Sequence, residues 1–279
     1  MNNLQETAIK ALINAFSVHN TLGESGKEDL QKNQFGDTAM KCDYEAEEAV
    51  LHVLNEHQIP VIVYSEEHGE VKITDNPQYL AVLDGIDGSH LYKAEWNQGR
   101  YGTMFGLYNG TNPTYNDYIF GGVMEHATKR LFYGLQGEGA FIKHFGTEKD
   151  ERIHASKADS LTKSTHIHID QYWDINNEVF TKKLEGYNVM EYKRCSSYHY
   201  TDVAMGEADL TLECTRKGSL EIAAAYPIVM EAGGVMVSIN GKRLADKKYL
   251  EFGQDTHLPV ITAATQKLAD SAVEFFKSE

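Results

Sequence analysis

The sequence predicts an α+β fold, with an antiparallel sheet and helices in the first half of the chain and an α/β arrangement in the second half. Three observations lead to this prediction. Two amphipathic segments open the chain, a block of short β-branched and aromatic runs follows, and strand and helix patterns alternate after residue 150. Runs of strands separated by turn residues favour antiparallel pairing, whereas alternation favours an α/β layer.

The first half begins with a helix over residues 4–16, where apolar side chains recur every three or four positions. A polar stretch with glycine at 22–34 indicates a loop, and a second helix is predicted over residues 43–56. Short apolar runs bounded by glycine and Asn-Gly then predict strands at 60–65, 79–84, 102–108, 118–124 and 130–133. We expect these strands to form one antiparallel sheet with helices on a face.

The charged segment 148–152 suggests a boundary between two domains, residues 1–150 and 151–279. The second half is predicted to contain strands at 164–170, 187–191 and 258–264, and helices at 177–184, 197–206, 220–232 and 268–276. Gly233 and Gly234 close the helix at 220–232. Because Pro227 in its middle costs about 3 kcal/mol in an undisturbed helix, we expect a kink there, or a later helix start.

Composition restricts the class of function. The chain of 279 residues carries 41 acidic and 26 basic side chains, a formal charge of −15, which disfavours nucleic acid and anionic membranes as partners. A phosphate ester would be repelled as well, unless bound metal lay between it and the protein. The three cysteines are far apart and form no CxxC pair, so neither a zinc site nor a disulfide framework is expected. A polar start and the lack of any long apolar run predict a cytoplasmic protein.

Acidic residues follow two of the predicted strands. One strand ends in Ser65-Glu66-Glu67, and the next runs into Asp84-Gly-Ile-Asp87-Gly-Ser89. Clustered carboxylates repel one another unless a cation neutralises them, and an oxygen-only ligand set favours Mg²⁺, Mn²⁺ or Ca²⁺. Asp-Gly is also common in ordinary turns, so turn formation is the alternative interpretation. The presence of Glu66 beside the second segment favours a metal site.

Four segments, taken in order along nearly the whole chain, resemble the inositol monophosphatase family. They are Asp37 with Asp43-Tyr-Glu-Ala-Glu47; Ser65-Glu66-Glu67 followed by Leu83-Asp84-Gly-Ile-Asp87-Gly-Ser89; the middle strands Gly121-Gly-Val-Met-Glu and Phe132-Tyr-Gly-Leu-Gln-Gly-Glu-Gly-Ala-Phe141; and Leu220-Glu221 through Glu231-Ala-Gly-Gly234. The resemblance implies a layered αβαβα sugar-phosphatase fold and a homodimer.

The resemblance also implies a set of metal ligands. Glu66, Asp84 and the backbone carbonyl of Ile86 match the ligands of one ion, and Asp84, Asp87 and Glu221 match those of a second. A third, weaker ion would bind at Glu66. The expected cofactor is therefore two or three Mg²⁺ ions, with Mn²⁺ as a possible replacement, and two such ions can hold the attacking and leaving oxygens of an in-line displacement.

Two further roles follow from the resemblance. Ser89 matches a residue that pairs with an upstream aspartate, here Asp43, and the pair helps a metal-activated water lose its proton. The N–H groups of Gly88 and Ser89, with Asp87 beside them, would bind the phosphate if they open a helix.

The substrate contacts are predicted from position alone. Five residues lie where this family contacts the rest of the substrate: Ser196, Ser197, Glu213, Arg216 and Lys217. The two basic residues could hold a distal phosphate, which would favour fructose 1,6-bisphosphate. The alternative is an ordinary solvated loop.

The resulting prediction is a Mg²⁺-dependent phosphatase of carbohydrate metabolism that hydrolyses inositol monophosphate, fructose 1,6-bisphosphate or both. The alternatives are a phosphatase of nucleotide-type substrates such as 3′-phosphoadenosine 5′-phosphate or NADP, recognisable by a large aromatic pocket, and an inactive metal-binding regulatory homologue. Three departures from the family pattern affect substrate and metal preference. Gly85 stands where proline is usual, and Leu220-Glu221 stands where Trp-Asp is usual. Asp87-Gly-Ser-His90-Leu-Tyr92 also departs from the usual D-G-T-x-N-F after the serine.

Overall fold

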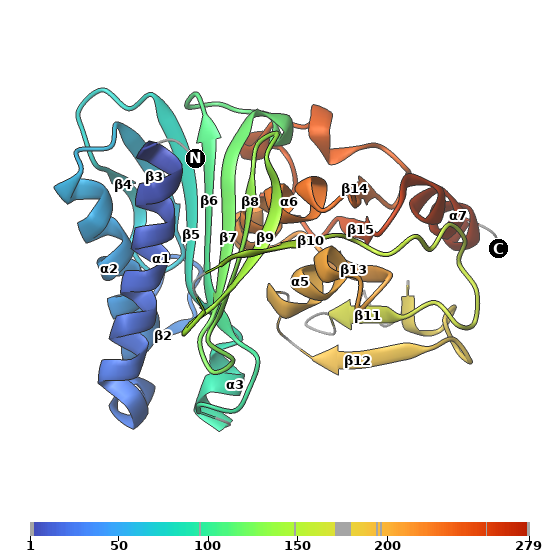
Figure 1. The fold of residues 1–279 in the computed structure, drawn as a ribbon, viewed down its shortest axis with the longest axis horizontal. Coiled ribbons are helices and arrows are strands. Elements are labelled where there is room, and N and C mark those ends of the chain that lie inside the picture. Colours follow the sequence, from blue (N-terminus) through green and yellow to red (C-terminus); the bar gives the residue numbers. More distant parts are fainter. Residues whose placement is uncertain are drawn as a thin grey trace.

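The computed structural model describes residues 3–94, 96–147, 149–170, 180–193, 195, 197–254 and 256–277. Its elements form layers in the order helices, sheet, helices, sheet, helix (Figure 1). The helical layers are α1 (Asn3–Leu22) with α2 (Lys41–Glu56), α5 (Ser197–Met205) with α6 (Leu220–Glu231), and α7 (Gln266–Lys277). The predicted α+β fold with αβαβα layers is confirmed.

The larger sheet has the order β10-β9-β8-β7-β6-β5-β3-β4. Its strands are β3 (Val61–Ser65), β4 (Gly69–Lys72), β5 (Tyr79–Asp87), β6 (Gly102–Asn109), β7 (Tyr118–Glu125), β8 (Arg130–Leu135), β9 (Gly139–His144) and β10 (Glu151–Ile153). All neighbours are antiparallel except β3 and β5, which are parallel. The prediction of a fully antiparallel sheet is wrong for this pair. After β3 the chain forms β4 at the edge of the sheet, and it then returns to begin β5 beside the start of β3. The two strands therefore end at the same edge of the sheet.

The sequence prediction missed several short elements of the first half. Strands β4, β9 and β10 were not predicted, and the loop expected at 22–34 contains a 3₁₀ helix (Gly23–Lys27) and strand β1 (Asp29–Lys32). β1 pairs with β2 (Thr38–Met40) in a separate ribbon. All four residues of β1 are exposed, so the strand shows no alternation of apolar and polar residues. The first helix also continues to Leu22 rather than ending at residue 16.

The smaller sheet has the order β12-β11-β13-β15-β14. Its strands are β11 (Ile167–Asp170), β12 (Val189–Lys193), β13 (Leu210–Cys214), β14 (Val235–Ser238) and β15 (Pro259–Ala263); β13 and β14 were not predicted. Of the helix predicted at 177–184, residues 177–179 lie outside the described residues, residues 180–181 are π-helical and residues 182–184 form a turn. The division into two domains near residue 150 stays a prediction. Strand β10 (Glu151–Ile153) follows this position and pairs with β9 in the larger sheet.

Helix α6 lies closely on the larger sheet because three glycines make room for it. Gly106, Gly121 and Gly134 face one another across β6, β7 and β8. A Cβ atom at Gly121 would lie 2.5 Å from the carbonyl oxygen of Ala224, and one at Gly134 would lie 2.5 Å from that of Pro227. This row of glycines fixes the position of α6, and with it the acidic residue in its first turn.

Pro227 lies inside α6, which begins at Leu220. The alternative prediction of a helix that starts closer to Pro227 is therefore wrong. A proline cannot donate a hydrogen bond to the carbonyl four residues earlier, here that of Ala223. The hydroxyl of Tyr108 donates to this carbonyl instead, at 2.7 Å. The buried acceptor is satisfied, and the helix continues past the proline.

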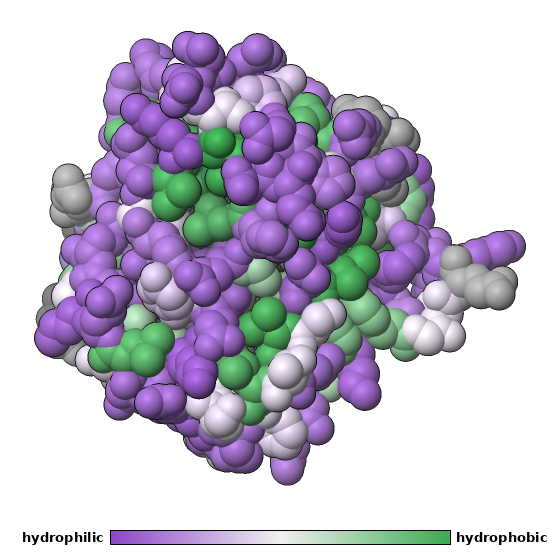
Figure 2. Space-filling model, turned by 90° about the vertical axis from the view of Figure 1, so that its left-hand side faces the viewer, coloured by the Kyte–Doolittle hydropathy of each residue, from purple (hydrophilic) through white to green (hydrophobic). Residues whose placement is uncertain are grey.

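The outer face of the molecule on the α1 and α2 side is largely hydrophilic, with separate hydrophobic patches (Figure 2). The apolar side chains of these two helices, including Leu12, Phe16 and Val50, pack against the larger sheet. Within the described part of the chain, no helix has the length and apolar character needed to cross a membrane.

Candidate active site

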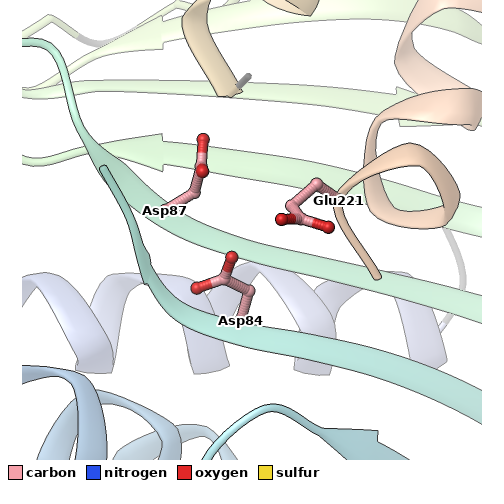
Figure 3. A group of neighbouring side chains, drawn as sticks. All are labelled: Asp84, Asp87 and Glu221. Atoms are coloured by element: carbon pink, nitrogen blue, oxygen red, sulfur yellow. The ribbon is translucent and has the colours of Figure 1, made fainter. Parts of the chain in front are cut away.

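Three buried carboxylates meet between the larger sheet and α6. Asp84 and Asp87 belong to the end of β5, and Glu221 belongs to the first turn of α6. One oxygen atom from each lies within 4.8 Å of the other two, and the side chains point toward one another (Figure 3). Their exposed fractions are 2, 5 and 5 %. The three residues predicted to bind a second metal ion are therefore brought together.

An irregularity in β5 allows both aspartates to face Glu221. Residues three apart in a regular strand point to opposite faces of the sheet. The pairing of β5 with β6 shifts between Asp84 and Asp87, as in a β-bulge, so the alternation is broken between them. The irregularity in β5 thus allows Asp84 and Asp87 to face the same carboxylate, that of Glu221.

The two glycines of this turn have different roles. Gly88 has φ +89°, a conformation that favours glycine. Gly85 does not have a positive φ. It provides space: a Cβ at Gly85 would lie 2.3 Å from the backbone oxygen of Asp43 at the start of α2. The lack of a side chain at Gly85 thus permits close contact between α2 and β5.

Asp87 is held from behind by the segment that leads into α5. The backbone N–H of Ser197 donates to its Oδ2 atom, and the Cys195 thiol lies 3.3 Å from the same oxygen. Ser197 is fully buried, so the structure places it behind Asp87. Its predicted role in substrate binding stays a prediction, and Ser196 lies outside the described residues.

Burial and mutual repulsion raise the pKa values of the central acids. The pKa of Asp84 lies well above its usual range because the group is buried and faces Glu66, Asp87 and Glu221. Burial raises the pKa of Asp43 in the same way, with Glu67 and Glu66 adding to the effect. Burial also raises the pKa values of Asp87 and Glu221, although Arg216 opposes it. A cation placed among these groups would favour their ionised forms.

The turn that carries Glu66 is anchored by Glu47 of α2. The buried carboxylate of Glu47 accepts hydrogen bonds from the Ser65 hydroxyl and from the backbone N–H groups of Glu66 and Glu67, at 3.0 and 3.1 Å. The His68 ring lies 2.8 Å from the same carboxylate. These contacts fix the direction in which the Glu66 side chain leaves the sheet. Burial and the neighbouring glutamates raise the pKa of Glu67 to about 8.

Two basic residues lie among the acids. Arg216 donates to Asp170 at 2.7 Å and to Glu221 at 3.0 Å, and its guanidinium lies 4.0 Å from Asp87. Burial lowers the pKa of Arg216, but the surrounding carboxylates outweigh it, Glu221 first, and the pKa is raised overall.

Lys217 is bound in a similar way at the other side of the site. Its ammonium group lies 2.7 Å from Glu66 and 2.6 Å from Asp37. Burial lowers its pKa, but Glu66 and Asp37 outweigh this effect and raise it overall.

The site opens into a pocket of about 280 Å³. Most of the predicted site residues line it: Asp43, Glu66, Asp84, Ile86, Asp87, Gly88, Ser89, Arg216, Lys217 and Glu221. Glu213 is buried near Arg216 and is not among the lining residues. Ser89 and Asp43 share the pocket, but no hydrogen bond joins their side chains within the described residues.

Sequence reasoning missed some residues that build this site. Asn33 lines the pocket and was not predicted, and Asp37 and Glu67, which belong to the recognised motifs but were given no role of their own, line it as well. Asp170 was missed as the partner of Arg216, although it ends a buried strand and the same strand-end rule that selected Asp84 would have found it. No comparable signal marks Asn33, which lies in a region predicted to be a plain loop.

The residues present fit a divalent cation. Seven carboxylates and two basic side chains line the pocket: Asp37, Asp43, Glu66, Glu67, Asp84, Asp87 and Glu221, with Arg216 and Lys217. The Oδ1 atom of Asp84 is buried and accepts no hydrogen bond within the described residues. A buried carboxylate oxygen without a donor is costly, and coordination of a hard cation is a natural way to satisfy it.

Comparison with known proteins places these features in a family. The model of the inositol monophosphatase family matches residues 1–274. A fructose-1,6-bisphosphatase/inositol-1-monophosphatase from Methanothermobacter thermautotrophicus is 26 % identical over 232 residues, covering 78 % of this chain and 77 % of that protein. A bifunctional NADP phosphatase/NAD kinase from Methanococcus maripaludis is 28 % identical over 238 residues, covering 79 % of this chain but 40 % of that protein.

The same fold occurs in solved structures. An IMPase from Thermotoga maritima superimposes with a TM-score of 0.77 at 19 % identity, covering 99 % of this chain and 97 % of the other.

Proposed function

The chain belongs to the inositol monophosphatase family, and from this membership we propose that it is a magnesium-dependent phosphatase of small phosphate monoesters. The observation that carries the proposal is the buried cluster of Asp84, Asp87 and Glu221, in which one oxygen of Asp84 has no hydrogen-bond donor within the described residues. Such a cluster costs free energy unless cations bind it. The pocket above it has the polar lining that a phosphate ester requires.

Two or three divalent ions would bind here, Mg²⁺ first and Mn²⁺ as a replacement. We assign Glu66, Asp84 and the carbonyl of Ile86 to one ion, and Asp84, Asp87 and Glu221 to another. Bound ions would neutralise the phosphate charge and activate water for attack on phosphorus. Without them the pocket carries an excess of carboxylates and repels the substrate.

The remaining chemistry belongs to the protein's own groups. Asp43 lies in the pocket, 5 % exposed, where bound cations would favour its ionised form, and an ionised carboxylate can accept a proton from the attacking water. Ser89 would orient that water together with Asp43. Helix α3 (Ser89–Ala94) begins at the pocket wall, so the N–H groups of Gly88 and Ser89 are available to phosphate oxygens.

The pocket favours a sugar or inositol phosphate as substrate. Among the described lining residues the aromatic ring is the imidazole of His90, and no phenyl, phenol or indole side chain offers a nucleotide base a larger stacking surface. Arg216 and Lys217 line the pocket and stay candidates for contact with a distal phosphate. NADP is the second candidate, because one relative is named a bifunctional NADP phosphatase/NAD kinase. We further propose that the protein acts as a cytoplasmic homodimer.

The test is phosphate release from four compounds: inositol 1-phosphate, fructose 1,6-bisphosphate, adenosine 3′,5′-bisphosphate and NADP. Each is assayed with Mg²⁺ and with a chelator. Release of phosphate from inositol 1-phosphate or fructose 1,6-bisphosphate that needs Mg²⁺ supports the proposal, and a preference for NADP would move the second candidate to the front. No release with Mg²⁺ or Mn²⁺ would favour the inactive regulatory homologue.

A further inference from the structure

The ammonium group of Lys217 joins two carboxylates from separate segments of the chain. Asp37 comes from the turn before β2, and Glu66 follows β3. The Nζ atom lies 2.6 Å from an oxygen of Asp37 and 2.7 Å from Oε1 of Glu66, which is direct ion pairing. The lysine side chain is 21 % exposed and that of Glu66 is 13 % exposed. The pair of Lys217 and Glu66 is therefore part of the wall of the site, whereas the side chain of Asp37 is 47 % exposed.

The backbone is held in an unusual conformation to place this lysine. Lys217, Gly218 and Ser219 have φ values of +44°, +72° and +54°, so two residues with side chains occupy the left-handed region. Such strain persists where the surroundings impose it, and it concentrates at functional sites. Here Gly218 is bound on both sides by Gln254: its N–H donates to the Gln254 carbonyl and its own carbonyl accepts from the Gln254 side chain, both at 3.2 Å. The turn is thus fixed by the neighbouring loop.

The strained turn also lies directly before the helix that carries one acid of the carboxylate cluster. Glu221 follows Lys217 by four residues, in the first turn of α6. Lys217 contacts Oε1 of Glu66, and the Glu66 side chain also lines the pocket. A fixed positive charge at Glu66 opposes the binding of a further cation on the same carboxylate, because like charges at this separation repel strongly in a partly buried site.

We propose that Lys217 is a built-in cation that occupies the place of a third metal ion at Glu66, so that this chain binds two divalent ions and not three. The inference rests on the proposed metal-dependent function and specifies its ion count. One ion would use Glu66 with Asp84, and the other would use Asp84, Asp87 and Glu221. Replacing the ammonium group by an uncharged side chain should open the additional position.

The test is the number of Mn²⁺ ions bound per chain, measured by equilibrium dialysis and by electron paramagnetic resonance of the free ion. The wild-type protein should bind about two ions, and Lys217→Met about one more. Lys143→Met is the matched control, because Lys143 is also partly buried, at 31 % exposed, and forms an ion pair of 2.7 Å with Asp150 away from the site. It should bind as many ions as the wild type.

The wild-type count tests the inference even if Lys217→Met does not fold, which circular dichroism will show. Three ions on the wild-type chain would overturn the inference, and so would an unchanged count in folded Lys217→Met. Lys217→Arg keeps the charge and should keep the wild-type count; an additional ion there would also overturn it. A wild-type chain that binds no Mn²⁺ and releases no phosphate would overturn the proposed function itself, whereas three ions with full activity would leave that function intact.

Discussion

Substitution of Gly85 by alanine should damage both stability and catalysis, because the new methyl group would strike the backbone. The added Cβ would lie 2.3 Å from the carbonyl oxygen of Asp43 and 2.9 Å from its carbonyl carbon. Real contacts of this type are about 1 Å longer, so β5 and the start of α2 must separate. Overpacking a rigid, buried position typically costs about 1–3 kcal/mol, and the upper end applies where the atom struck is backbone.

The same separation moves the catalytic groups. Asp43 and Asp84 lie on the two segments that are forced apart, and a displacement of about 1 Å in an active site can lower the rate about 100-fold. We therefore expect Gly85→Ala to unfold at a urea concentration about 1 M lower than the wild type, taking a denaturant slope of about 3 kcal/mol per molar. Its Mg²⁺-dependent phosphate release should fall by about two orders of magnitude.

Gly137→Ala is the matched control for this substitution. Gly137 has φ +73° with open space around its Cβ position, so alanine there meets only the conformational cost of about 1 kcal/mol. Urea unfolding followed by circular dichroism compares the two variants. A Gly85→Ala protein with the stability of the wild type and full activity would refute the account of this close contact.

The other predictions concern α6 and the pH dependence of the site. Tyr108→Phe removes the hydrogen-bond donor to the Ala223 carbonyl, which Pro227 cannot supply, and should lower the free energy of unfolding by about 1–2 kcal/mol in urea. Tyr79→Phe is the control and should change this free energy little, because the Tyr79 hydroxyl has no hydrogen bond in the described part of the chain. Equal effects of the two substitutions would argue against the role of Tyr108. In the metal-free protein, the folded state holds protons on Asp43, Glu67 and Asp84 at pH values where the unfolded chain has lost them, because the folded pKa values are raised. Stability is therefore greatest in mild acid and should fall between about pH 5 and pH 8, the range that ends near the pKa of Glu67. Saturating Mg²⁺ should remove most of this slope, and a Tm in chelator that rises over the same range would contradict the pKa shifts.

The sequence predicted those helices and strands in which apolar residues recur at a regular spacing. Helix α2 and strands β3 and β5 were expected within a few residues of their bounds, because their apolar faces are buried and repeat regularly. Strand β1 could not be found in this way, since every side chain in it is exposed. The parallel pairing of β3 and β5 was also missed, because local patterns do not show the direction of a neighbouring strand.

The candidate site was predictable where strands end in acids and less so where charges pair across the chain. Asp84, Asp87 and Glu221 were expected together, and the structure brings them together. The ion pair between Lys217 and Glu66 joins residues 151 positions apart. It depends on the strained turn before α6, and neither the composition nor the spacing of the residues indicates that turn.

The central claim is that the carboxylate cluster at the end of β5 supports metal-dependent phosphate hydrolysis. Asp87→Asn tests it most directly, because the substitution keeps the size of the side chain and its acceptor oxygen while removing the charge. Phosphate release from the best substrate is measured against Mg²⁺ concentration for the wild type and for this variant, with circular dichroism to confirm folding. We expect a folded Asp87→Asn protein with a rate at least about 100-fold lower at any Mg²⁺ concentration. A folded variant that retains the wild-type rate and the wild-type Mg²⁺ dependence would contradict the account.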